Sequence, residues 1–139
     1  MTGEKSYGYF DHDADIGIVG RGKTLEAAFI SAAEAMFAIM ADLNAIKPEI
    51  EIAVAFDEAD NEFALVTWLN MLIAEARDKG LALGQFKITQ QNGRWQGHAW
   101  GEPWRDDLER GVEVKGATLT MLSVHKADDD WEARCVVDV

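Results

Sequence analysis

Apolar residues recur at helical spacing in two stretches of the chain. Residues 24 to about 42 place them on one broad face, which predicts a helix with Thr24 as its N-cap. A second helix is predicted to follow the capping residue Asp60 and to stop at Gly80, since glycine readily adopts the left-handed conformation. The predicted buried stripes consist of Leu25, Ala28, Phe29, Ala32, Met36 and Met40, and of Leu65, Trp68, Leu69, Leu72 and Ala76.

Strand patterns precede and separate the two helices. Residues 7–10 and 16–19 are short apolar runs that predict strands, and Gly20, Arg21 and Gly22 are expected to form a loop before Thr24. After Pro48, apolar residues alternate with acidic or small ones over residues 50–56. This period of two predicts a half-buried strand whose acidic face meets solvent.

The second half of the chain is rich in hairpin signals. Asn92-Gly93 is a strong hairpin turn between predicted strands at Phe86–Ile88 and residues 95–100. A polar loop is expected over residues 102–111. Strands are then predicted at residues 112–124 and 131–139, with a turn at residues 127–130. The pattern predicts an α+β fold in which two helices pack on one face of a mainly antiparallel or mixed β-sheet.

Composition limits the possible function classes. With 139 residues, 48% of them apolar, the chain is long enough for one domain over residues 1–139. Thirteen basic and twenty-five acidic side chains give a net charge of −12, which disfavours direct binding of nucleic acid. No apolar run reaches the length of a membrane span. A single cysteine, Cys135, and the lack of a signal-peptide pattern favour a cytoplasmic location.

Acidic residues gather near both ends of the chain. Asp11, Asp13 and Asp15 lie within five residues, and Asp138 precedes the last residue. Such carboxylates suit a cation if the two ends meet, although aspartates are also common in turns. The cluster is no EF-hand, because Ile16 stands at the sixth position, where glycine is required. The histidines His12, His98 and His125 lack the spacing of a zinc site and are expected on the surface.

Residues 17–24, GIVGRGKT, match the phosphate-binding P-loop pattern G-x-x-x-x-G-K-T. A P-loop follows a buried strand of a parallel sheet, whereas here three aspartates precede the first glycine and their charges would oppose a triphosphate. The hairpin-rich second half also disfavours a parallel sheet. We therefore expect Lys23 to be a solvated residue before a helix.

Several motifs together resemble the archease family. They are DHDADIG at residues 11–17, the helix start KTLE at 23–26, GE at 101–102, EVK at 113–115 with Thr118, and the closing AR and VDV. They span the chain in the family's order. The resemblance implies a small cytoplasmic α+β protein that is not an enzyme, and acts as a protein cofactor of the RtcB-type RNA ligase of tRNA splicing and RNA repair.

The same resemblance implies a calcium site at Asp15, Asp138 and an oxygen of Val139. These hard oxygens suit Ca²⁺ or Mg²⁺. Asp11, Asp13 and His12 would surround the cation without binding it. Glu113 and Lys115 share one face of a predicted strand and would contact the ligase, the alternative being a structural ion pair between them.

Two residues depart from the family pattern. Asp13 stands where the family usually has threonine, which adds negative charge beside the cation. Thr120 stands where the family often has histidine, which leaves any role of that histidine open. Two other function classes remain as alternatives, a general chaperone or adaptor for RNA-modifying enzymes and a P-loop nucleotide-binding protein.

Overall fold

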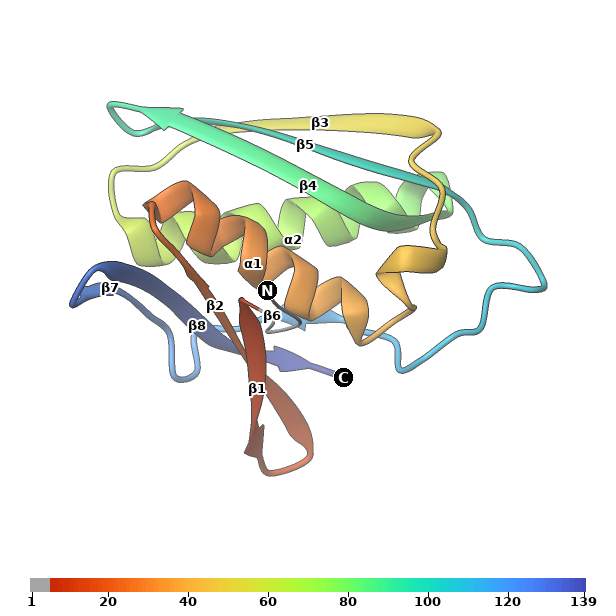
Figure 1. The fold of residues 1–139 in the computed structure, drawn as a ribbon, viewed down its shortest axis with the longest axis horizontal. Coiled ribbons are helices and arrows are strands. Elements are labelled where there is room, and N and C mark those ends of the chain that lie inside the picture. Colours follow the sequence, from red (N-terminus) through yellow and green to blue (C-terminus); the bar gives the residue numbers. More distant parts are fainter. Residues whose placement is uncertain (1–5) are drawn as a thin grey trace.

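The computed structural model describes residues 6–139, in which two helices lie between two antiparallel sheets (Figure 1). One sheet has the order β1 (Tyr7–His12), β2 (Asp15–Gly22), β8 (Asp130–Asp138), with β6 (Gly116–Ala117) and β7 (Ser123–Ala127) both pairing with β8. The other has the order β3 (Ile50–Asp57), β5 (Arg94–Pro103), β4 (Leu81–Gln91). The helices are α1 (Leu25–Ala38) and α2 (Asn61–Lys79), and the short 3₁₀ helix η1 (Leu43–Ala45) follows α1.

The predicted helix caps are confirmed. Thr24 Oγ1 accepts the N–H of Ala27 at 3.0 Å, and Asp60 caps α2 at its first turn. Gly80 ends α2 in the left-handed region at φ 66°. The first helix ends at Ala38, earlier than the predicted end near residue 42, because the chain turns there toward η1.

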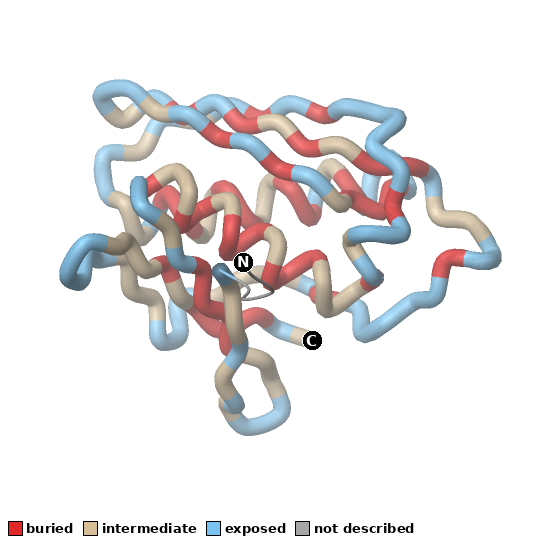
Figure 2. Tube along the Cα trace, in the orientation of Figure 1, coloured by how far each residue is buried: buried red, intermediate tan, exposed pale blue. Residues whose placement is uncertain are grey.

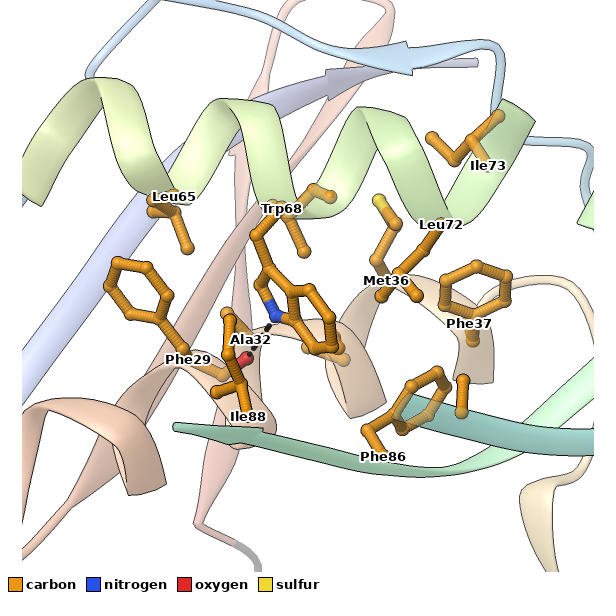
Figure 3. Close-up of a cluster of buried hydrophobic side chains, with 14 of the residues drawn as sticks. Phe29, Ala32, Met36, Phe37, Leu65, Trp68, Leu72, Ile73, Phe86 and Ile88 are labelled. Atoms are coloured by element: carbon orange, nitrogen blue, oxygen red, sulfur yellow. Dashed lines mark hydrogen bonds between the residues drawn. The ribbon is translucent and has the colours of Figure 1, made fainter. Parts of the chain in front are cut away.

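The hydrophobic core lies in the helical layer and against the inner faces of both sheets (Figure 2). Trp68 of α2 is fully buried, and its Nε1 donates to the carbonyl oxygen of Phe29 in α1 at 3.1 Å (Figure 3). The Phe29 ring in turn stacks on Trp95 of β5, with centroids 4.8 Å apart. These contacts join both helices to the β3–β5–β4 sheet.

The α+β class and the antiparallel pairing are confirmed, but the strands form two sheets where one was expected. Each sheet has the helices on one face and solvent on the other, so the predicted half-buried alternation still applies. In β3, for example, Ile52 and Val54 are buried and Glu51 and Ala53 are exposed.

The continuous strand predicted over residues 112–124 is wrong. Residues 112–115 are not paired in a sheet, and β6 and β7 are separated by a loop in which Met121 has φ 55°. In this loop Thr118 Oγ1 donates to the Val136 carbonyl at 2.8 Å and accepts from Thr120 N. The side chain therefore replaces part of the ladder between the strands.

The turn predicted at residues 127–130 is present between β7 and β8, and Asn92-Gly93 forms the β4–β5 hairpin with positive φ at both residues. Among residues 6–139 no helix has the length and apolar character needed to cross a membrane.

Candidate functional site

The start of β2 and the end of β8 lie side by side in the first sheet. Ile16 of β2 pairs with Val137 of β8, so Asp15 and Asp138 come one step beyond this pair on neighbouring strands. The backbone N–H of Val139 donates to Asp15 Oδ1 at 3.4 Å. The register of two strands from opposite ends of the sequence thus positions the three residues of the predicted cation site together.

Lys115 joins this corner through its backbone. Its N–H donates to the carbonyl oxygen of Asp138 at 2.7 Å, and the next residue, Gly116, pairs with Asp138 in the sheet. Val114 is buried, whereas Glu113 and Lys115 on either side of it are exposed. Among the described residues no ion pair joins Glu113 and Lys115, so the structural ion-pair alternative is not supported.

The other acidic residues lie on the β1–β2 hairpin, whose tip projects from the body of the molecule (Figure 1). Asp13 occupies the turn with φ 52°, and its side chain is 92% exposed. His12 Nδ1 lies 3.9 Å from Asp13 Oδ2 and makes no hydrogen bond. Asp11 is exposed on β1.

The donor set of this corner consists of oxygens. In residues 6–139 no three His, Cys, Asp or Glu side chains converge as a metal-binding group. A cation at Asp15 and Asp138 would therefore complete its shell with an oxygen of Val139 and with water, which suits Ca²⁺ or Mg²⁺ because both accept carboxylate, carbonyl and water oxygens. A soft metal would lack its preferred ligands.

The three histidines lie on three different strands, and the cysteine is buried. His98 Nδ1 is 2.7 Å from Glu51 Oε2 in the other sheet, and His125 Nδ1 is 3.0 Å from Ser123 Oγ in β7. With His12 on β1, the three do not form a zinc site in the described chain. Cys135 is fully buried in β8, and burial raises the pKa of its thiol to about 12.

The P-loop look-alike is a strand, so the loop predicted at residues 20–22 is wrong. Residues 15–22 form β2 and pair with β8 up to Gly22. A Cβ atom on Gly20 would collide with the Ala32 nitrogen and the Ala28 carbonyl of α1, and one on Gly22 would collide with Ala27. The glycines therefore allow close packing of α1 on β2, and no loop remains to surround a phosphate.

Lys23 follows this strand at the start of α1. Its side chain is 80% exposed, and its Nζ lies 2.9 Å from Asp130 Oδ1. The predicted solvated position before a helix is confirmed, with an ion pair that the sequence did not predict.

Two contacts that sequence reasoning missed lie along β8, before it reaches the corner. Arg134 of β8 lies over the Phe10 ring of β1, with Cζ 4.5 Å from the centroid. The carbonyl oxygen of Thr120 accepts the Val136 N–H at 3.0 Å. No sequence signal marks these contacts, because they depend on the register between distant strands.

Comparison with known proteins shows the family of this chain. Residues 7–139 match the model of the family described as "Archease protein family (MTH1598/TM1083)". The chain belongs to the archease family. The match includes β1, β2 and β8, which form the corner.

Individual members of the archease family align over nearly the whole chain. "Protein archease" of Sulfolobus acidocaldarius is 34% identical over 134 residues, which cover 94% of this chain and 96% of that protein. "Protein archease" of Pyrococcus furiosus is 33% identical over 141 residues, covering 97% and 99%. The solution structure of Methanobacterium thermoautotrophicum protein 1598 has a TM-score of 0.82 at 30% identity and covers 98% of this chain and all of that one.

Proposed function

We propose that this chain is a non-catalytic cofactor protein that activates an RtcB-type RNA ligase in tRNA splicing and RNA repair, in the cytoplasm. Membership of the archease family supports the partner and the role. The choice of functional residues rests on one observation, the corner where Asp15, Asp138, Val139 and the backbone of Lys115 meet.

A divalent cation, Ca²⁺ or Mg²⁺, would bind at this corner through Asp15, Asp138 and an oxygen of Val139. Its charge would offset the repulsion between neighbouring carboxylates. Asp13, whose side chain is exposed in the turn, would add a favourable field without a coordination bond. The bound cation would fix the hairpin tip and the end of β8 relative to Lys115.

The mode of action is assistance to one state of the ligase. A partner protein accelerates guanylylation if it binds the reactive ligase state more tightly than the others. The net charge of −12 favours docking beside the basic groove that a ligase needs for RNA, and it disfavours binding of naked tRNA. The protein would therefore reach RNA only through its partner.

The cation is tested by thermal unfolding with and without Ca²⁺ or Mg²⁺. Binding to the native state at 100 times Kd stabilises by about 2.7 kcal/mol, which raises the thermal midpoint of a chain of this size by about 10 °C. Asp15→Asn and Asp138→Asn should abolish the rise. Asp57→Asn, at the exposed end of β3 in the other sheet, is the matched control and should keep it. A rise that survives in both site variants would remove the cation from this corner.

The partner surface is tested by single-turnover guanylylation of an RtcB-type ligase. Lys115→Ala should lose stimulation and keep the wild-type melting curve, because an exposed lysine contributes little to stability. Lys126→Ala, an exposed lysine of β7, is the control and should stimulate fully. Stimulation should also fall as added salt screens the docking charges. A wild-type protein that leaves the ligase unaffected but rescues an unrelated RNA-modifying enzyme would favour the general chaperone instead.

A further inference from the structure

A cavity of about 450 Å³ lies where both helices end. Its walls come from the C-terminal ends of α1 and α2 and from the start of β4, which Figure 1 shows on the same side of the molecule as the long loop after β5. The wall side chains are mainly apolar and include Phe37, Met40, Ile73, Ala76, Leu81 and Leu83. This size and lining are typical of pockets for small organic ligands.

The cavity is closed on one side by residues 104–114, which we call the strap. At one end the Trp104 N–H donates to the Gly80 carbonyl at 3.3 Å. At the other end Gly111 N donates to Met40 O at 2.8 Å and Val112 N to Ile39 O at 3.1 Å. Leu108 is buried in a small cluster between these points. The strap is therefore anchored at both ends and the cavity is already formed in the free protein.

Two arginines of the cavity lining make no ion pair with an acidic side chain among the described residues. Arg77 Nη2 donates only to the Val114 carbonyl, at 3.5 Å, and Arg110 Cζ lies 4.0 Å from the centroid of the Trp104 ring. The neighbouring Arg105, by contrast, binds both Glu102 and Asp107 at 2.9 Å. Both side chains are exposed, so they lie at the mouth of the cavity, whereas the equally unpaired and exposed Arg94 of β5 lies outside its lining.

Compensation of the helix carboxyl ends explains these arginines only in part. The carbonyls of Ile39 and Met40 at the end of α1 already accept N–H groups of the strap. Arg110 contacts Trp104 instead of a helix end. Glu113 is the one acidic side chain of the lining, so the charged groups of the cavity are positive by one.

We propose that this cavity binds an amphipathic organic acid. Its apolar body would occupy the space between Phe37, Ile73 and Leu83, and its carboxylate would be bound by Arg77 and Arg110. A planar guanidinium group matches a carboxylate with two parallel hydrogen bonds, and the two exposed arginines at the mouth would leave the apolar body of the ligand inside the cavity. The cavity adjoins the corner at Asp15 and Asp138, because Glu113 and Val114 of its lining precede Lys115, but the proposed ligand does not depend on the ligase role.

The proposal is tested by calorimetry with decanoate and decanol, which share a chain and differ in charge. Wild-type protein should bind decanoate about tenfold or more tightly than decanol, as expected for a charge-assisted pair. Arg77→Leu combined with Arg110→Leu should remove this preference. Arg94→Leu, an exposed arginine at the start of β5, is the control and should retain it.

Substitutions that fill the cavity provide a second test of the binding site. Ala76→Leu should weaken decanoate binding, and its melting curve shows whether the fold persists. Val112→Trp changes a residue that is 52% exposed at the rim, so it should fold and also weaken binding. Equal affinity of wild type for decanoate and decanol would refute the preference for an acid. No binding of either ligand, or full binding in both Ala76→Leu and Val112→Trp, would refute the binding site itself.

Discussion

Gly20→Ala is the substitution that most directly tests how β2 packs in this protein. The added methyl group would collide with the Ala32 nitrogen and the Ala28 carbonyl oxygen of α1. Both are backbone atoms of a helix, so they cannot rotate away as a flexible side chain would. Relief requires the whole helix to shift from a strand that it contacts along its length.

The size of the effect follows from these contacts. Overpacking a core costs about 1–3 kcal/mol, and a clash with backbone belongs at the upper end of this range. Alanine also reduces the entropy of the unfolded chain by about 0.4–1 kcal/mol, which offsets part of the cost. Gly8→Ala in β1 is the matched control, because nothing lies within 4 Å of its added Cβ. The two variants should differ by about 3 kcal/mol, or about 10 °C in thermal midpoint.

Thermal and urea unfolding of wild type and both variants measure this difference. Gly20→Ala should unfold at clearly lower temperature and urea concentration, whereas Gly8→Ala should stay within about 0.5 kcal/mol of wild type or slightly above it. If Gly20→Ala melts with wild type, α1 does not pack on β2 as described. Loss of nucleotide binding without loss of stability would restore the P-loop hypothesis.

Three further predictions concern single side chains. Hydrogen bonds from Arg105 and from the Lys47 N–H lower the pKa of Glu102 from 4.5, so the stability that this carboxylate contributes is present above pH 4.5 and is lost as pH falls through the lowered pKa. The difference in thermal midpoint between wild type and Glu102→Gln should therefore close in acid. A difference that widens in acid contradicts this prediction. Cys135 should resist iodoacetamide near pH 8 in the native protein and react in urea, because its thiol is buried and its pKa is raised to about 12. Mass spectrometry measures the labelling, and rapid labelling of the native protein would show that β8 opens. Lys23→Ala should retain ligase stimulation in the guanylylation assay, since it removes only an exposed ion pair with Asp130, and a strong loss would mean that this surface contacts the partner.

Local signals in the sequence predicted the parts of the fold that depend on neighbouring residues. Thr24, Asp60 and Gly80 act through hydrogen bonds or dihedral angles of their own helix ends, and Asn92-Gly93 acts within one hairpin. The alternation in β3 likewise gave its buried face. The α+β class follows from the order of these elements.

What the sequence could not predict depends on contacts between distant segments. Gly20 looks like a loop residue until α1 is placed against it, and the break after Ala117 depends on hydrogen bonds between Thr118 and β8. The division of the strands into two sheets is equally non-local. The meeting of Asp15 with Asp138 was expected from the family resemblance and requires the β2–β8 register, which no local pattern contains. No sequence pattern marks Trp104 and Arg110, because their segment is polar.

The single cysteine has a practical consequence for measuring partner docking in solution. Cys135 is fully buried, so a cysteine introduced at the surface would be the one thiol open to a maleimide dye in the native state. Lys87 of β4 offers such a position, exposed on the outer face of the β3–β5–β4 sheet. The helical layer separates this sheet from β2 and β8, the strands of the corner (Figure 1). A donor dye at residue 87 can thus report energy transfer to a labelled partner without touching the docking surface proposed above.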